Sequence, residues 1–377
     1  MKILVTGARG FLGRNLIVAL RRNPDHVIYE YDLDSIRESL EAALASADVI
    51  YHLAGVNRPR DPDEFISGNV EFTAYLCDAL IRLGRNPTLI FTSSVQAASD
   101  NPYGLSKRKA EEILVDFGRS TGAKVAVFRL PGVFGKWCRP NYNSVVATFC
   151  HNITRDIPIT IKDPDREIDL VHIDDVVKAF LGVLETDLWN NDRVYEVQPI
   201  FRVTVSRLAE LLTRFKAGRT DLMTPDFSDP FIRRLYSTYV SYIMESEFAY
   251  SLPIQADARG ELAEFLKSVH FGQIFISRTR PGIVRGNHYH DLKVEKFAVL
   301  EGQAIIRFRS IQGADAFEYR VSGREFRVVD IPPGYTHSIE NIGNTDMVVL
   351  FWAFEPYDPM RPDTYSLNVE VEKDKQV

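Results

Sequence analysis

Tyr103 and Lys107 have side-chain types and a spacing that fit acid–base chemistry. They are four residues apart in a segment with helical periodicity, so both side chains lie on one face of the helix. A phenol titrates at about pH 10, and a neighbouring positive charge lowers that pKa toward neutral pH. The pair could supply acid–base chemistry, whereas a lone Tyr-x-x-x-Lys is usually just an amphipathic helix face.

A second group of polar side chains lies in the last third of the chain and consists of His288, His290, Glu295 and His337. Alternate residues of a strand point to one face, so His288 and His290 can converge with Glu295 and His337 on one cation. Three imidazoles and one carboxylate suit zinc, iron, nickel or manganese, and we expect zinc. The alternative is a pair of hydrogen-bonded histidines in a barrel without metal.

A glycine turn follows the first apolar run, residues 1–6, and precedes a helical pattern at residues 15–20. In this order, backbone N–H groups and the helix N-terminus can bind a diphosphate. A second strand ends at Asp32, where a carboxylate can accept hydrogen bonds from ribose hydroxyls. We therefore expect a dinucleotide site; turn glycines followed by a surface aspartate are the alternative.

The elements that must position these groups change in type along the chain. Strands alternate with helices in the first half, which predicts a doubly wound parallel sheet. The expected strands are residues 1–6, 26–31, 49–53, 89–92 and 124–129, and the expected helices include 70–83, 107–117, 205–215 and 235–243. From about residue 250 short strands dominate, which predicts an antiparallel barrel or jelly roll. These strands are residues 272–278, 295–300, 304–310, 325–330 and 347–354. We expect an α/β domain at residues 1–245 and an all-β domain at residues 246–377.

The first half resembles the extended short-chain dehydrogenase/reductase family, whose members act on nucleotide sugars. The resemblance rests on Gly7-x-x-Gly10-x-x-Gly13, His52-Leu53-Ala54-Gly55, Thr92-Ser93-Ser94 and Tyr103-x-x-x-Lys107. It implies that Tyr103 protonates a carbonyl oxygen, that Ser94 hydrogen-bonds this oxygen, and that Lys107 holds the cofactor ribose and tunes Tyr103. The implied cofactor-binding residues are Gly7, Arg9, Gly10, Phe11, Leu12, Gly13, Asp32, Leu53, Ala54 and Lys107.

The family also has a substrate lobe, which the segments after Arg129 resemble. Arg166 matches the arginine that binds the nucleotide diphosphate, a task suited to a guanidinium group. Asn143 and His172 are expected substrate contacts by position, and Asp174 and Asp175 are expected to cap or support the following helix.

The cofactor expected from this resemblance is NADPH, which reductive sugar enzymes use. Asp32, however, favours the free ribose hydroxyl of NADH, because it would repel a 2′-phosphate unless Arg9 or another cation offsets the charge. Tyr103 lies only nine positions after Ser94, so we expect the wall of the active site between them to be short.

The second half resembles a cupin. Its first motif runs from Gly282 through the histidines to Gly302, and its second from Pro332 to Asn341, with Phe326 in place of the leading glycine. The segment Asp257-x-Arg259-Gly260-x-Leu262-x-Glu264-Phe265 looks like the start of nucleotide-sugar 4-keto epimerases. Those enzymes typically use a histidine base and a tyrosine, so the proton-abstracting group stays open. Candidates are His288 if it is not a ligand, Lys293 and Tyr335.

Nearly the whole chain resembles the bifunctional epimerase/reductases of capsular-polysaccharide synthesis that make a precursor of UDP-N-acetyl-L-fucosamine. The resemblance implies a UDP-linked 4-keto-6-deoxy amino sugar as substrate, epimerised at C3 by the cupin and then reduced at C4. It also implies a homodimer formed through the cupin domain.

A second hypothesis keeps the reductase and makes the cupin a metal-stabilised module for dimerisation or sensing. A third makes the front domain a cofactor-binding regulator without chemistry.

Composition sets the remaining limits. A chain of 377 residues exceeds the size of one core, so two domains are the default. A net charge of −6 without basic blocks argues against nucleic-acid binding, and no apolar run is long enough for a membrane span. Three cysteines without paired spacing fit a reducing compartment, so we expect a cytoplasmic protein.

Overall fold

The computed structural model describes residues 1–185, 194–253, 255–257, 260–262, 266, 272–355 and 359–370. The chain forms two compact units. The first unit is Met1–Val145 with Glu167–Val203, and the second is Val146–Arg166 with Thr204–Val377. The expected boundary between residues 245 and 246 stays a prediction. No helix in the described ranges is long and apolar enough to cross a membrane.

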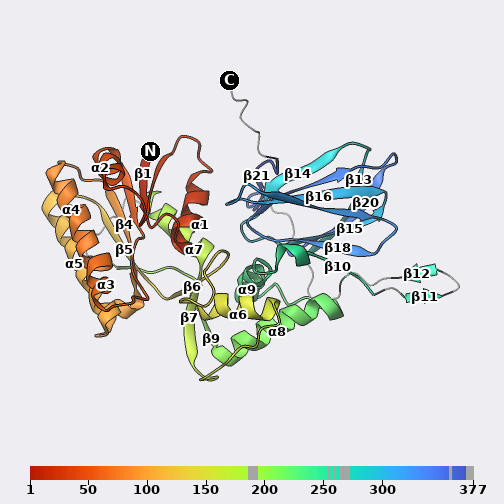
Figure 1. The fold of residues 1–377 in the computed structure, drawn as a ribbon, viewed down its shortest axis with the longest axis horizontal. Helices are drawn as coiled ribbons and strands as arrows, with labels where there is room; N and C mark the ends of the chain where they lie inside the picture. Colours follow the sequence, from red (N-terminus) through yellow and green to blue (C-terminus); the bar gives the residue numbers. More distant parts are fainter. Residues whose placement is uncertain are drawn as a thin grey trace. The chain divides into compact units, whose positions relative to one another are not determined.

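The first unit is built on a six-stranded sheet in the order β2-β1-β3-β4-β5-β8, with parallel pairing throughout (Figure 1). Its strands are β1 (Lys2–Thr6), β2 (Val27–Tyr31), β3 (Val49–His52), β4 (Thr88–Ser94), β5 (Val125–Leu130) and β8 (Val194–Tyr195). The strands β6 (Gly132–Phe134), β7 (Glu167–His172) and β9 (Phe201–Thr204) form a small separate sheet.

Helices cover both faces of the large sheet. Alternate residues of a strand point to opposite faces, so each face has apolar side chains that a helix can bury. Ile3 and Val5 pack into the core beside α1 and α7, whereas Leu4 packs into the core beside α2, α4 and α5. The helices of this unit are α1 (Phe11–Leu20), α2 (Arg37–Ser46), α3 (Asp63–Phe65), the π-helix η1 (Ile66–Glu71), α4 (Phe72–Arg82), η2 (Val95–Ala98), α5 (Pro102–Thr121), α7 (Ile173–Gly182) and η3 (Val183–Glu185). The predicted doubly wound parallel sheet is confirmed.

The second unit combines three main helices with an antiparallel β domain. The helices are α6 (Val145–Thr154), α8 (Val205–Asp221) and α9 (Pro230–Val240), followed by the short helix η4 (Glu245–Glu247). The side chains of Thr204 and Asp229 cap α8 and α9 by accepting backbone hydrogen bonds, and Pro230 opens α9. In the segment expected to open the β domain, β11 (Gln255–Asp257) pairs with β12 (Gly260–Leu262). Arg259, Glu264 and Phe265 lie outside the described residues.

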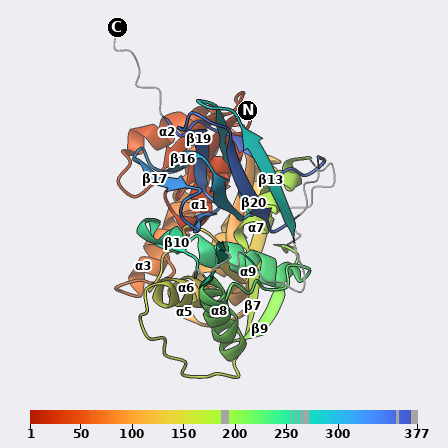
Figure 2. The ribbon, with the colours of Figure 1, turned by 90° about the vertical axis from the view of Figure 1, so that its right-hand side faces the viewer.

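Two five-stranded antiparallel sheets form the β domain, and strands of both can be followed in Figure 2. Their orders are β10-β18-β15-β20-β13 and β17-β16-β19-β14-β21. The bounds are β10 (Ala249–Ser251), β13 (Gln273–Thr279), β14 (Val284–Tyr289), β15 (Glu295–Glu301), β16 (Gln303–Ser310), β17 (Ala316–Ser322), β18 (Arg327–Ile331), β19 (Tyr335–Asn341), β20 (Met347–Ala353) and β21 (Tyr365–Ser366). The sheets pack face to face: the ring of Phe297 in β15 lies 5.8 Å from that of His337 in β19. The predicted all-β C-terminal domain is confirmed.

Candidate functional site

The glycine turn between β1 and α1 brings backbone close to backbone. Gly7 has φ +67°, and a Cβ there would lie 2.8 Å from the backbone nitrogen of Ala54. A Cβ on Gly13 would lie 2.3 Å from the carbonyl oxygen of Gly7. Leu53 and Ala54 follow the end of β3 and thus lie beside the turn. A cofactor site formed by both segments requires this closeness. Gly10, the N-cap residue of α1, has no side chain to cover the N–H groups of Phe11 and Leu12, which suits a diphosphate.

Asp32 and Arg9 form an ionic group at the end of β2. One oxygen of Asp32 accepts a hydrogen bond from the Arg9 backbone N–H at 2.7 Å, and the other accepts from Leu33 at 2.9 Å. The Arg9 guanidinium pairs with Asp34 and lies 3.9 Å from Asp32. One cation therefore faces two carboxylates at the place where the adenosine ribose is expected.

Ser94, Tyr103 and Lys107 converge at the carboxyl end of the sheet, Ser94 at the end of β4 and the other two on α5. Burial raises the pKa of the Tyr103 phenol, and a hydrogen bond with Ser94 partly offsets this. The sequence predicts that Lys107 lowers this pKa, whereas in the structure burial raises it. The Lys107 ammonium donates to the Thr92 carbonyl oxygen at 2.9 Å instead.

Lys107 is itself buried, and Glu111 lies one helical turn further along α5. Burial lowers the pKa of Lys107 to about 8, while the charge of Glu111 raises it. Glu111 also accepts hydrogen bonds from Arg129 at 2.9 and 2.6 Å and from Ser93. This carboxylate therefore links the active-site helix to β4 and β5.

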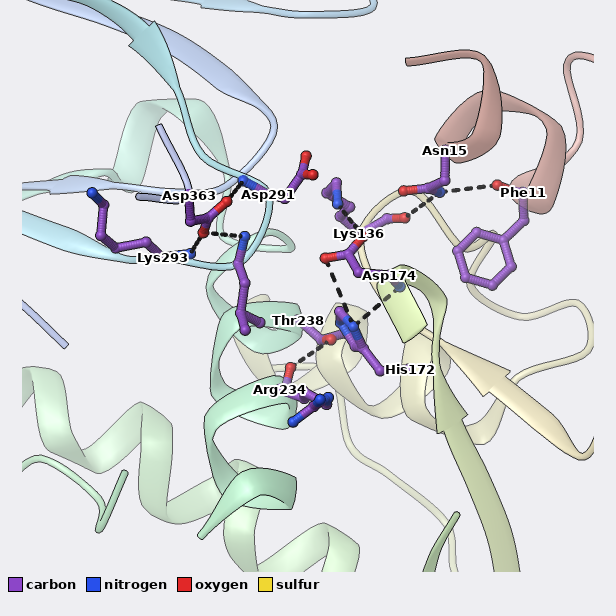
Figure 3. Close-up of polar contacts among 11 residues, drawn as sticks. Phe11, Asn15, Lys136, His172, Asp174, Arg234, Thr238, Asp291, Lys293 and Asp363 are labelled. Carbon is purple, nitrogen blue, oxygen red and sulfur yellow. Dashed lines mark hydrogen bonds and ion pairs between the residues drawn. The ribbon is translucent and has the colours of Figure 1, made fainter. Parts of the chain in front are cut away.

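The expected substrate residues lie in different surroundings. Asn143 and Arg166 are exposed, whereas His172 is only 2% exposed. Nδ1 of His172 accepts a hydrogen bond from the Asp174 backbone N–H at 3.3 Å and so caps α7 (Figure 3). Asp174 also pairs with the buried ammonium of Lys136 at 2.8 Å, which agrees with its expected supporting role. The substrate roles of Asn143, Arg166 and His172 stay predictions.

The four expected metal ligands are brought together inside the β domain. His288 and His290 come from β14 and its end, Glu295 opens β15 and His337 lies on β19. One ligand atom of each lies within 4.8 Å of the others. Nε2 of His290 lies 3.2 Å from a Glu295 oxygen, and Nε2 of His337 lies 3.7 Å from the same oxygen.

The protonation states of this cluster fit a divalent cation. Burial, followed by the charge of His290, lowers the pKa of His288 to about 4, and burial also lowers the pKa of His337 well below its usual value. Burial alone would raise the pKa of Glu295, but His290, His337 and Lys293 lower it to about 2. Neutral imidazoles and an ionised carboxylate are metal ligands. Nε2 of His337 is buried without a hydrogen-bond partner among the described residues, a cost that a bound cation would remove.

The three candidate bases of the β domain differ in their partners. His288 belongs to the cluster, with its ring 4.7 Å from that of His337. The Lys293 ammonium donates to Oγ1 of Thr364 at 3.0 Å and lies 3.8 Å from Glu295. The Tyr335 hydroxyl donates to Glu245 at 2.7 Å, and burial raises its pKa. Lys293 thus lies directly beside the cluster.

Comparison with known proteins gives whole-length and partial relatives. Residues 3–197 match the NAD dependent epimerase/dehydratase family, and residues 255–365 match the polysaccharide biosynthesis C-terminal domain. The chain is 47% identical over 369 residues to a UDP-2-acetamido-2,6-beta-L-arabino-hexul-4-ose reductase of Pseudomonas aeruginosa, covering 98% of this chain and 99% of the relative. The chain belongs to the NAD dependent epimerase/dehydratase family.

Solved structures include one match over nearly the whole chain and one over part of it. The capsular polysaccharide assembling protein CapF from Staphylococcus aureus has 44% sequence identity and a TM-score of 0.68, over 98% of this chain and 100% of that one. The UDP-glucuronic acid 4-epimerase of Bacillus cereus, at 21% identity and a TM-score of 0.52, covers 58% of this chain and 85% of its own, and shares the fold. The chain-wide resemblance to capsular-polysaccharide enzymes expected from the sequence is confirmed.

Two residues of these sites were not identified from the sequence. Glu111 continues the Tyr103 and Lys107 helix face at the same four-residue spacing, a signal that is present in the sequence. Asp363 contacts His290 from a segment more than seventy residues later, and no spacing rule connects the two.

Proposed function

We propose that this member of the epimerase/dehydratase family converts a UDP-linked 4-keto-6-deoxy amino sugar in two steps. The cupin domain epimerises C3 of UDP-2-acetamido-2,6-dideoxy-4-hexulose, and the reductase domain then reduces C4 to give UDP-2-acetamido-2,6-dideoxy-L-talose, for capsule or O-antigen synthesis. The observation that carries the proposal is the presence, in one chain, of a Ser94, Tyr103 and Lys107 group and a buried histidine and glutamate cluster. The name of the 47% identical relative, a UDP-linked hexul-4-ose reductase, supports the substrate class.

The order of the two steps follows from the chemistry of the ketone. A C4 ketone makes the hydrogens at C3 and C5 acidic, because the enolate charge spreads onto the oxygen. Reduction removes the ketone and this acidity with it. Epimerisation must therefore come first.

In the reduction, the residues of the first unit bind, orient and move a proton. When bound, NADPH supplies a hydride to C4, with NADH as the alternative that Asp32 supports. Tyr103 donates its phenolic proton to the developing alkoxide, and Ser94 hydrogen-bonds the same oxygen. Lys107 holds the cofactor ribose, and the Tyr103 phenolate is reprotonated from solvent.

In the cupin, His288, His290, Glu295 and His337 would hold the divalent cation, for which we propose zinc. Such an ion would act as a Lewis acid on the ketone oxygen. Lys293, which lies 3.8 Å from Glu295, and Tyr335 remain the candidate bases. We also propose a homodimer formed through this domain.

A second candidate function follows from the burial of the ligands. His290 and His337 are 0% and 1% exposed, which is typical of closed structural metal sites. In this alternative the chain is a 4-ketosugar reductase with a non-catalytic cupin used for dimerisation or sensing.

Two single substitutions separate these functions. With NADPH and the 4-keto sugar, Tyr103→Phe should lower reduction by about 10²- to 10⁴-fold but leave C3 exchange intact. His290→Ala should abolish C3 exchange and formation of the talo product at unchanged dimer content. If His290→Ala forms that product at the wild-type rate, the cupin is not catalytic. If Tyr103→Phe reduces normally, the reductase assignment is wrong.

A further inference from the structure

The segment that follows residue 358 runs alongside the histidine strand of the second unit. Strand β21 pairs with β14 so that Ser366 lies opposite His288 and Tyr365 opposite Tyr289. The Leu367 backbone N–H extends this pairing by donating to the Asn287 carbonyl oxygen at 2.8 Å. Asp363 precedes β21 and is therefore held next to the end of β14.

The backbone of Asp363 determines which nitrogen of His290 carries the proton. Its carbonyl oxygen lies 2.6 Å from Nδ1 of His290. A carbonyl can only accept, so Nδ1 must donate. In the neutral ring, the form that binds a metal, Nε2 then carries the lone pair, on the side of the ring that faces Glu295 at 3.2 Å.

The side chain of Asp363 fixes the turn that leads from His290 to Glu295. Its carboxylate accepts three successive backbone N–H bonds, from Asp291 at 2.9 Å, Leu292 at 3.0 Å and Lys293 at 2.6 Å (Figure 3). Asp363 itself has φ +38°, in the left-handed region that few residues other than glycine adopt. Thr364 adds a fourth bond by accepting from the Lys293 ammonium at 3.0 Å.

We infer that Asp363 is a positioning residue of the metal site. It sets the tautomer of His290 through its carbonyl and fixes, through its carboxylate, the turn that carries Lys293 to Glu295. The inference rests on the proposed function, because it assumes that the cluster binds a metal. Groups that orient a metal-bound histidine typically change metal affinity by about 10- to 100-fold.

The test is zinc affinity of the full chain, measured by competition with a chromophoric chelator. Asp363→Asn keeps the size of the side chain, but its amide NH₂ cannot accept the bonds that one carboxylate oxygen now accepts. We expect this variant to bind zinc about 10- to 100-fold more weakly than wild type, with an altered absorption spectrum of the cobalt-substituted protein. Asp315→Asn, the same charge change at an exposed position of the β domain, should have wild-type affinity and spectrum.

The outcomes distinguish failure of the metal site from failure of the role of Asp363. If the wild-type chain binds no zinc, the proposed metal site fails before Asp363 is tested. If wild type binds and Asp363→Asn matches it in affinity and spectrum, the positioning role is wrong. Should Asp363→Asn not fold, Asp363→Gly provides the second test, because glycine accepts the left-handed backbone and removes only the carboxylate. Wild-type affinity in Asp363→Gly would likewise overturn the inference.

Discussion

Arg9 illustrates how a single exposed side chain can set cofactor preference. Its guanidinium pairs with Asp34 and lies 3.9 Å from Asp32, so two carboxylates hold it. For Arg9 to bind the 2′-phosphate of NADPH, its guanidinium would have to leave Asp34. The carboxylates of Asp32 and Asp34 would repel that phosphate.

Replacing Asp34 should therefore favour NADPH. An exposed ion pair contributes up to about 1 kcal/mol, so Asp34→Asn should raise the ratio of kcat/KM for NADPH over NADH by about two- to fivefold. Initial rates with each cofactor measure this ratio. Asp116→Asn, the same change at an exposed acid on α5, is the control. A ratio that stays the same or falls would show that Arg9 does not bind the 2′-phosphate.

The individual residues of the sites differ in how far the sequence predicts them. Tyr103, Lys107 and the cluster residues lie at spacings that follow from helix and strand geometry. In the structure Tyr103 hydrogen-bonds Ser94, and the four cluster residues lie together. The burial of His172 was not foreseen, because position in the sequence does not tell whether a ring caps a helix or faces solvent. Asp363 depends on a long-range chain reversal that no local pattern encodes.

At the scale of elements, α5 carries Tyr103 and Lys107 on one face, and Glu111 anchors that face to the sheet. Glu111→Gln should destabilise the first unit by about 2 kcal/mol, because Arg129 and Ser93 lose a charged acceptor. Urea unfolding measures this loss. Glu112→Gln, the exposed neighbour on the same helix, should change stability little.

The same substitution should also change the pH profile of reduction. Burial lowers the pKa of Lys107 to about 8 and Glu111 raises it, so losing the Glu111 charge lowers this pKa further. Lys107 then loses its proton at a lower pH, and the alkaline fall in kcat/KM for the cofactor should move toward neutral pH. An alkaline limb that stays in place in Glu111→Gln would contradict this coupling.

Hydrophobic pattern predicts some elements well and others poorly. The expected strands at residues 49–53 and 347–354 agree closely with β3 (Val49–His52) and β20 (Met347–Ala353), since both are nearly continuous apolar runs. Strand β14 has the sequence VRGNHY, with a register shift between Gly286 and His288, and shows no apolar alternation. His288 of the histidine and glutamate cluster thus lies in a strand that the hydrophobic pattern of the sequence does not reveal.

At the scale of the whole molecule, the two chemistries belong to separate compact units. The reductase group and the glycine turn lie in the first unit, and the histidine and glutamate cluster lies in the second. In the proposed two-step function, one substrate would meet both sites in turn, with the cupin site first because the C3 hydrogen is acidic only before reduction. The change of strand pattern near residue 250 predicts two units, but it does not show that residues 146–166 and 204–245 group with the second one.

In the proposed function, C3 epimerisation precedes and does not require reduction. The direct measurement is proton NMR of the UDP-4-keto-6-deoxy amino sugar in D₂O with the purified protein, first without cofactor and then with NADPH. We predict that deuterium enters at C3 without cofactor and that the talo product, deuterated at C3, appears after NADPH is added. Reduction with no exchange at C3 would contradict the two-step account and leave a reductase with a non-catalytic β domain.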